Sequence, residues 1–151
     1  MPGKKLRVLH VDDQRQWRSI VSDYLVLFGD YEIISAESGE EALNLLSATS
    51  FDIIVSDFRM PEMDGTRLLQ YIRERGESLP FIFLTGTRYE DLDLDPEKPG
   101  DSLYVNKSGA PSQVFSVLSQ KICQAVARHK TVQALKKHQI EESGHSPVLP
   151  V

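Results

Sequence analysis

Residues 51–65 read Phe51-Asp-Ile-Ile-Val-Ser-Asp57-Phe-Arg-Met-Pro61-Glu-Met-Asp-Gly65, an apolar run that ends in a carboxylate and is followed by turn-forming residues. The apolar residues at 53–55 predict a β-strand that is buried on both faces, as strands of parallel sheets are. Pro61 and Gly65 indicate that a loop follows this strand. Active sites of open parallel sheets lie at the carboxyl ends of the strands, where Asp57 falls. The stretch therefore predicts an α/β fold with Asp57 at its functional edge.

The same alternation of strand and helix patterns continues on both sides of this stretch. Strands are predicted near 6–11, 31–36, 51–57, 80–85 and 102–106, and helices near 14–28, 38–48, 65–75 and 112–138. This order predicts a flavodoxin-like, doubly wound sheet of five parallel strands, in the order 2-1-3-4-5, with helices on both faces. Within the first helix, a stripe predicts burial of Ile20, Tyr24, Leu27 and Phe28.

The segment between the last two strands departs from this regularity. It carries several aspartates, which are poor helix formers, and Pro96 and Pro99, which break helices. We expect an irregular or shortened fourth helix, at most one short turn near 88–94, followed by a loop.

Charged and hydroxyl side chains stand at the ends of four predicted strands: Asp12-Asp13, Asp57, Thr85 and Lys107. Carboxylates about 4 Å apart repel one another by about 4 kcal/mol per pair at an effective dielectric of about 20, so such a cluster holds protons or a cation. Carboxylate oxygens suit Mg²⁺, which would let an anionic phosphoryl donor approach. An aspartate carboxylate can then act as the nucleophile and become an aspartyl phosphate.

Each of these residues also has a simpler interpretation. The Asp12-Asp13 pair could cap the helix predicted from Gln14, since aspartate is a favoured N-cap residue. Thr85 could be a turn residue and Lys107 a solvated surface charge. Their shared position at strand ends favours a common site over four independent surface features.

The stretch Asp57-x-x-Met-Pro-x-Met-Asp-Gly65 closely resembles response-regulator receiver domains, the phospho-acceptor modules of two-component signalling. The resemblance covers about residues 5–130. It implies that Asp57 is phosphorylated and that the cofactor is Mg²⁺. Asp13, Asp57 and the backbone carbonyl of Arg59 would bind the metal, with Asp12 acting through a metal-bound water.

The resemblance also implies how the site responds. Thr85 and Lys107 would contact the phosphoryl group, and Thr85 and Tyr104 would form the conformational switch. One departure lies beside this site: Ser108 stands where the family usually has a proline after a cis peptide bond. A non-proline cis bond costs about 3 kcal/mol, so we expect a trans bond and a differently shaped loop.

Composition restricts the class of protein. With 151 residues, a net charge of −5 and no basic recognition helix, we expect no nucleic-acid partner. No apolar run approaches membrane-spanning length, and a single cysteine fits a reducing cytoplasm, so we expect a cytoplasmic protein without a membrane partner. Cys123 is expected in or near the core, and His10 is expected to be a hydrogen-bonded structural residue.

The chain is divided into a receiver domain over 1–130 and an extended helix end with a tail or linker over 131–151. The last predicted helix is longer than the sheet requires. It is interpreted as a dimerisation coil, a linker to another domain, or a solvated helix end.

The function predicted from these features is a phosphorylation switch. The expected partner is a sensor histidine kinase or phosphotransfer domain, and a homodimer through the 88–106 face or the C-terminal helix is a second expectation. No turnover enzyme is expected beyond self-phosphorylation and slow autodephosphorylation. A haloacid-dehalogenase-like phosphatase would need an acid where Arg59 stands. The alternative is a docking module of receiver type that works without phosphorylation.

Overall fold

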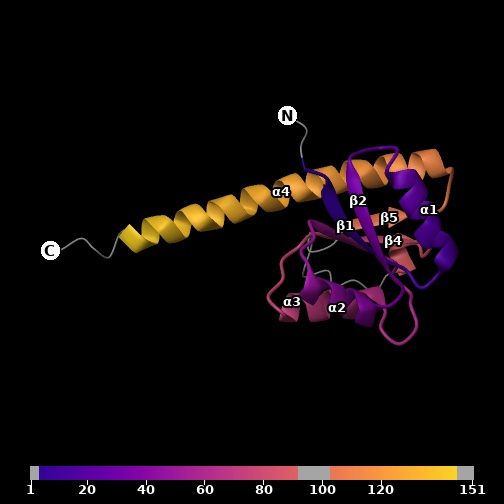
Figure 1. Cartoon of the computed structure of the whole chain (residues 1–151), viewed down its shortest axis with the longest axis horizontal. Coiled ribbons are helices and arrows are strands. Elements are labelled where there is room, and N and C mark those ends of the chain that lie inside the picture. Colours follow the sequence, from indigo (N-terminus) through magenta and orange to yellow (C-terminus); the bar gives the residue numbers. More distant parts are fainter. Residues whose placement is uncertain (1–3, 92–102, 146–151) are drawn as a thin grey trace.

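The computed structural model describes residues 4–91 and 103–145. A parallel sheet of five strands runs through it, in the order β2-β1-β3-β4-β5 (Figure 1). Its strands are β1 (Leu6–Val11), β2 (Tyr31–Ala36), β3 (Ile53–Ser56), β4 (Phe81–Thr85) and β5 (Leu103–Asn106). Each neighbouring pair is parallel, so the predicted order 2-1-3-4-5 is confirmed.

Helices cover both faces of this sheet, as the doubly wound prediction requires. They are α1 (Arg15–Leu25), α2 (Gly39–Ala48), α3 (Gly65–Glu74) and α4 (Pro111–His145). Figure 1 shows α1 and α4 on one face and α2 and α3 on the other. Two separate apolar clusters fill the spaces between the sheet and these two helix pairs.

Neighbouring residues of β1 show how one strand serves both layers. Val8 belongs to the cluster beneath α1 and α4, whereas Leu9 and Val11 belong to the cluster beneath α2 and α3. All three are fully buried. Successive side chains of a strand point to opposite faces, so a central strand covered on both sides must be apolar at consecutive positions.

Side-chain caps fix where two of the helices begin. The Ser38 hydroxyl accepts a hydrogen bond from the Glu41 N–H at the start of α2, and the Asp64 carboxylate accepts one from the Arg67 N–H at the start of α3. Each cap satisfies a backbone donor that has no partner within the helix.

The start of α3 lies in close contact with the residues that follow β3. A Cβ atom at Gly65 would lie 2.3 Å from the Asp57 carbonyl oxygen and 2.8 Å from the Phe83 ring. The Gly65 N–H donates to the Phe58 carbonyl at 2.8 Å. Only glycine permits this close approach, which holds the chain around Asp57 against α3.

Between β4 and β5, the described residues contain one short 3₁₀ turn, η1 (Tyr89–Asp91). This agrees with the short turn predicted near 88–94. The remainder of the predicted loop, and most of the 88–106 face, lie at 92–102, outside the described residues.

The last helix, α4, extends well past the sheet (Figure 1). Its first half packs on the core through Phe115, Leu118 and Ile122. Further along, Val132 and Leu135 are 38% and 58% exposed. The helix is described through His145, seven residues beyond the predicted end at 138, because good helix formers continue up to Gly144. Within the described residues, no helix has both the length and the apolar character needed to cross a membrane.

Candidate functional site

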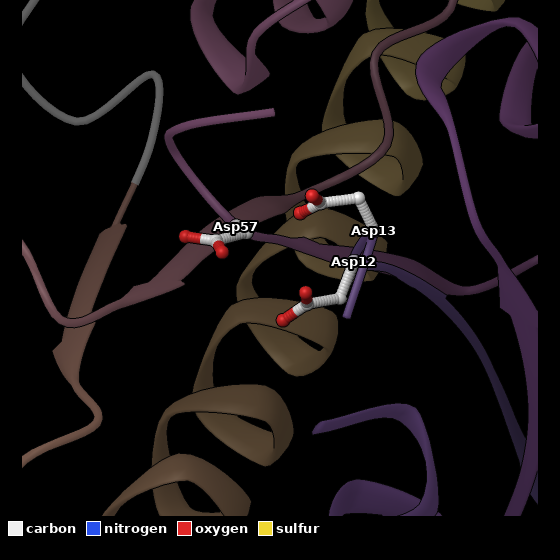
Figure 2. Close-up of side chains that lie close together, drawn as sticks. All are labelled: Asp12, Asp13 and Asp57. Carbon is white, nitrogen blue, oxygen red and sulfur yellow. The ribbon is translucent and has the colours of Figure 1, made fainter. Parts of the chain in front are cut away.

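Three carboxylates meet at the carboxyl edge of the sheet. Asp12 and Asp13 follow β1 and Asp57 follows β3, and these two strands are direct neighbours. The Asp57 N–H donates to the Val11 carbonyl at 2.9 Å, which fixes the two strand ends side by side. One oxygen from each carboxylate lies within 4.8 Å of the others (Figure 2). Asp12 and Asp57 are buried, whereas Asp13 is exposed.

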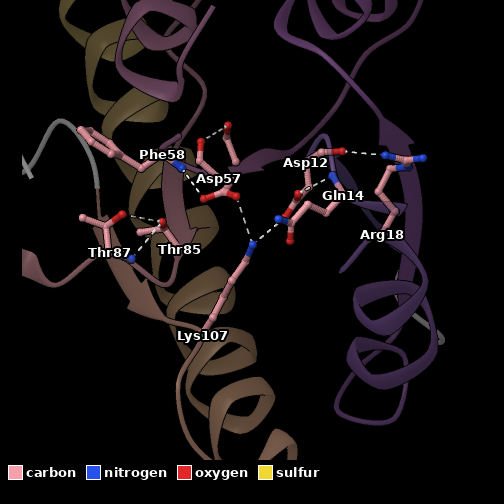
Figure 3. Close-up of polar contacts among 9 residues, drawn as sticks. Asp12, Gln14, Arg18, Asp57, Phe58, Thr85, Thr87 and Lys107 are labelled. Carbon is pink, nitrogen blue, oxygen red and sulfur yellow. Dashed lines mark hydrogen bonds and ion pairs between the residues drawn. The ribbon is translucent and has the colours of Figure 1, made fainter. Parts of the chain in front are cut away.

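Lys107 bridges the two buried carboxylates. Its Nζ lies 2.7 Å from Asp12 Oδ2 and 3.1 Å from Asp57 Oδ2, and its side chain is only 7% exposed (Figure 3). The Lys107 N–H donates to the Thr85 carbonyl, so the lysine is anchored to the end of β4. The same ammonium lies 4.5 Å from the centroid of the Trp17 ring. One cation thus partly offsets two anions, and all three side chains are largely buried.

Asp12 is the most deeply buried member of this cluster. Burial raises the pKa of Asp12 above its usual value, although hydrogen bonds from Lys107 and from the Gln14 N–H act in the opposite direction. Asp12 Oδ1 accepts that Gln14 N–H at 2.9 Å. Gln14 itself is the N-cap of α1, and its side chain forms no cap. Asp12 therefore bonds to the cap residue without being the cap, so the capping alternative does not replace its place in the cluster.

Thr85 lies beside the carboxylates, and its hydroxyl is bonded to Thr87. Thr85 Oγ1 accepts the Thr87 N–H at 3.2 Å and donates to Thr87 Oγ1 at 3.4 Å (Figure 3). The Tyr104 hydroxyl donates to the Thr87 carbonyl at 2.6 Å, and the tyrosine ring packs against the cluster beneath α2 and α3. Both residues of the predicted switch therefore form hydrogen bonds to Thr87.

Arg59 lies at the mouth of the site. A groove open to solvent is lined by Trp17, Asp57, Arg59, Thr85, Thr87 and Lys107. The Arg59 guanidinium stacks over the Phe58 ring, 5.6 Å from its centroid, and the residue is exposed. The Phe58 N–H donates to Asp57 Oδ1 at 2.7 Å, which fixes the rotation of that carboxylate. The Arg59 side chain leaves the groove open and does not occupy it.

Comparison with known proteins agrees with this geometry. The family described as "Response regulator receiver domain" matches residues 8–119. The chain belongs to this family. Response regulator protein FleR of Pseudomonas aeruginosa is 37% identical over 123 residues, which are 82% of this chain and 24% of FleR. Sensor histidine kinase RcsC of Salmonella typhimurium is 42% identical over 80 residues, 53% of this chain and 8% of RcsC.

Solved structures of receiver domains share the fold. A response regulator receiver domain protein from Clostridium thermocellum aligns with a TM-score of 0.70 and 26% identity, covering 84% of this chain and 98% of that one. TrrA of Thermotoga maritima, in complex with Mg²⁺-BeF, aligns with a TM-score of 0.67 and 32% identity, covering 80% of this chain and 98% of that one. The chain spans a quarter or less of the length of the curated relatives it matches.

The acidic cluster of this receiver domain has the donor set that Mg²⁺ prefers. Mg²⁺ takes hard oxygen ligands, usually one or two protein carboxylates, and keeps several waters. The Asp57 carboxylate lies at a groove open to solvent and Asp13 is exposed, while Asp12 is fully buried and already bonds to Lys107 and Gln14. This division fits two direct carboxylate ligands with Asp12 behind them.

Two polar residues of the receiver domain around the site were not found from the sequence. The first is Arg18, whose guanidinium donates to the Asp12 carbonyl at 2.9 Å. Asn106 donates to the Tyr104 hydroxyl at 2.6 Å. Asn106 and Tyr104 are two residues apart on one strand and so share a face, and this was the one signal that the sequence offered.

Two sequence expectations outside the active cluster of the receiver domain are wrong. Cys123 was expected in or near the core, but it is exposed on α4, where its Sγ lies 3.6 Å from the Tyr31 hydroxyl. His10 was expected to be hydrogen-bonded, but it is fully buried and neither ring nitrogen has a partner among the described residues. Burial, helped by the charges of Lys107 and Arg18, lowers the pKa of His10 to about 3.

His10 should make the stability of the receiver domain fall as the solution becomes acidic. Its pKa is about 6.5 when unfolded and about 3 when folded, so only the unfolded chain takes up this proton between these values. The contribution is fully present above pH 6.5 and is lost towards pH 3, by about 1.4 kcal/mol per pH unit. Urea unfolding at pH 7 and pH 5 should differ by about 2 kcal/mol less in His10→Leu than in the natural chain. An equal pH dependence in both proteins would contradict the buried neutral imidazole.

Proposed function

We propose that this receiver domain accepts a phosphoryl group on Asp57 from the phosphohistidine of a sensor histidine kinase or phosphotransfer domain. The observation that carries the proposal is the Lys107 ammonium, held between Asp12 and Asp57 at the edge of an open groove. Such an ammonium can pair with a phosphoryl oxygen once the group has arrived.

The proposed transfer proceeds by an in-line attack of Asp57 on the phosphorus of the donor. An oxygen of the Asp57 carboxylate forms a bond to phosphorus while the phosphorus–nitrogen bond of the donor breaks, and the imidazole leaves with the electron pair and takes up a proton. The Phe58 N–H holds the carboxylate in one rotation, which supports an orientation fixed before the donor binds. The exposed side of the groove leaves room for a partner domain.

Asp13, Asp57 and the backbone carbonyl of Arg59 are the proposed Mg²⁺ ligands, with Asp12 acting through a metal-bound water. The proximity of the three carboxylates supports this set. When bound, Mg²⁺ supplies positive charge that offsets the carboxylates and the phosphoryl oxygens. TrrA, whose structure is a complex with Mg²⁺-BeF, is 32% identical and supports the same cofactor here.

Thr85 and Tyr104 are the proposed switch. In the described structure the Thr85 hydroxyl is bonded to Thr87, and a phosphoryl group on Asp57 would compete for it. Tyr104 bonds to the carbonyl of the same Thr87, so a shift of residues 85–87 would reach the tyrosine directly. Such a shift would pass the local change in charge to the outer surface.

Binding of Mg²⁺ should change the fluorescence of Trp17. Trp17 is the single tryptophan in the chain, and its ring lies 4.5 Å from the Lys107 ammonium. A dication among the carboxylates would weaken the hold of Asp12 and Asp57 on this ammonium and alter the environment of the ring. We expect a saturable fluorescence change on titration with MgCl₂, reversed by chelator and absent from Asp13→Asn/Asp57→Asn. A titration without a saturable change would contradict the proposed metal site.

Phosphoryl transfer itself tests the function. Incubation with acetyl phosphate and Mg²⁺ is expected to add one phosphoryl group per chain, seen by intact mass, and incubation with chelator is expected to add none. Transfer without a kinase would favour the switch over the alternative, a phosphorylation-independent docking module. A chain that gains no mass from acetyl phosphate or from a phosphohistidine donor would favour docking.

We also propose a domain division and a location for the chain. The receiver domain spans residues 1–130, an extended helix end and tail or linker span 131–151, and the protein is cytoplasmic; the family match over residues 8–119 supports the first of these. A homodimer through α4 is supported by the exposed Val132 and Leu135, whereas the 88–106 face lies mostly outside the described residues. We propose no turnover activity beyond self-phosphorylation and slow autodephosphorylation.

A further inference from the structure

Asn106 stands between the switch tyrosine and the loop that carries Lys107. Its Nδ2 donates to the Tyr104 hydroxyl at 2.6 Å, and its Oδ1 accepts the Ser108 N–H at 2.7 Å. The residue is half-buried at the end of the edge strand β5. The Asn106 side chain therefore contacts both the switch residue Tyr104 and the loop residue Ser108.

These contacts continue into a chain of hydrogen bonds in which each bond shares a residue with the next. From Asn106 it passes to the Tyr104 hydroxyl, which donates to the Thr87 carbonyl at 2.6 Å. The Thr87 N–H donates to Thr85 Oγ1 at 3.2 Å. The Thr85 carbonyl in turn accepts the Lys107 N–H at 2.9 Å. This chain of hydrogen bonds starts at Asn106, passes through both switch residues, Tyr104 and Thr85, and ends at the Lys107 N–H.

The direction of every bond in this chain is fixed by its ends. A backbone N–H can only donate, so the Asn106 oxygen must face Ser108 and its amide nitrogen must face Tyr104. A backbone carbonyl can only accept, so the Tyr104 proton must point to Thr87. Replacing the amide by an apolar group would remove the donor that Asn106 supplies to the Tyr104 oxygen and the acceptor that it supplies to the Ser108 N–H.

The contact with Ser108 is possible because this chain has a serine where the receiver family usually has a proline. A proline at position 108 would have no N–H for Asn106 to accept. Here the residue after Lys107 is a serine, its N–H is used, and the described residues contain no cis peptide bond. The asparagine side chain thus holds a loop that carries no proline.

We propose that Asn106 is a positioning residue that couples the Lys107–Ser108 loop to the Thr85–Tyr104 switch, an inference that rests on the proposed function. By donating to Tyr104, it stabilises the inward position of that ring over the apolar cluster beneath α2 and α3. By accepting from Ser108, it fixes the backbone from which the Lys107 side chain extends. A phosphoryl group would then meet a lysine and a tyrosine that are already arranged.

Binding of beryllofluoride in the presence of Mg²⁺ tests this coupling, with Trp17 fluorescence as the readout. Asn106→Val should weaken binding by about two- to tenfold, the effect of one or two lost hydrogen bonds. Tyr104→Phe should weaken binding by a similar factor. The double variant should bind beryllofluoride no more weakly than the single variant of lower affinity, because both substitutions break the same chain of hydrogen bonds. The affinity for Mg²⁺ alone should stay unchanged.

Backbone resonances provide a readout that a general loss of packing would not reproduce. In ¹H–¹⁵N spectra, Asn106→Val should shift the Thr87 amide resonance and Tyr104→Phe should shift the Ser108 amide resonance. Each of these amides is connected to the substituted residue through another residue of the hydrogen-bond chain. Asn44→Val, at an exposed position on α2, is the matched control and should shift neither. The inference would be overturned if Asn106→Val bound beryllofluoride as tightly as the natural chain does. It would also be overturned if the double variant lost affinity by the product of the two single-variant factors. If the natural chain does not bind beryllofluoride, the proposed function fails, and the two amide shifts still decide the coupling.

Discussion

Asp57→Asn is expected to abolish phosphorylation of the chain by acetyl phosphate. The amide has no anionic oxygen to attack phosphorus, yet it has the shape of the carboxylate and can still accept the Phe58 N–H. The fold should persist, because the substitution removes one of two like charges held by the same ammonium. Intact mass after incubation with Mg²⁺ and acetyl phosphate is the measurement, and far-ultraviolet circular dichroism checks the fold.

The control is Asp23→Asn, at an exposed position on α1 away from the cluster. This variant should gain one phosphoryl group as the natural chain does. Asp13 is the alternative phosphoryl acceptor to consider, since it is an exposed carboxylate in the same cluster. Full phosphorylation of Asp57→Asn would move the acceptor to another residue, and peptide mapping of the adduct would identify it.

The strand pattern was sufficient to predict the fold and the position of the acidic cluster. Parallel strands bring their carboxyl ends to one edge, so Asp12, Asp57, Thr85 and Lys107 had to meet once the strand order was known. The sequence could not supply the pairing within the cluster. That Lys107 contacts both Asp12 and Asp57 depends on side-chain rotamers, which follow from packing and not from spacing.

The errors also have physical causes. Burial of the stripe on the first helix was predicted too widely. Because α1 ends at Leu25, Leu27 and Phe28 leave the helical face and are exposed. Tyr24 is also exposed, although its ring stacks on Phe115. His10 sits on a central strand with apolar neighbours, and a sequence does not show whether a buried polar group finds a partner. The links through Asn106 join its amide to the Tyr104 hydroxyl and to the Ser108 N–H, and both depend on a side-chain rotamer that periodicity does not register.

Lys107→Met is expected to destabilise the chain strongly when no divalent cation is present. Lys107 is the only cation within hydrogen-bonding distance of the buried Asp12 and Asp57 carboxylates among the described residues. Removing one partner of a buried ion pair costs about 3 kcal/mol or more, because the remaining charge stays out of water. Methionine keeps most of the apolar stem that packs beside Trp17, so the loss should report charge rather than volume. Urea unfolding in chelator measures the change.

Mg²⁺ should then stabilise Lys107→Met more than it stabilises the natural chain. In the natural protein the ammonium already offsets part of the acidic charge, and a dication must compete with it. In the variant the three carboxylates face the cation alone, so binding should be tighter and its contribution to the free energy of unfolding larger. Lys130→Met, at an exposed position on α4, should show neither the loss in chelator nor the larger gain with Mg²⁺. Equal stability of Lys107→Met and the natural chain in chelator would show that the acidic cluster is neutralised by other means, and the assignment of Lys107 as the phosphoryl-pairing cation would lose its electrostatic basis.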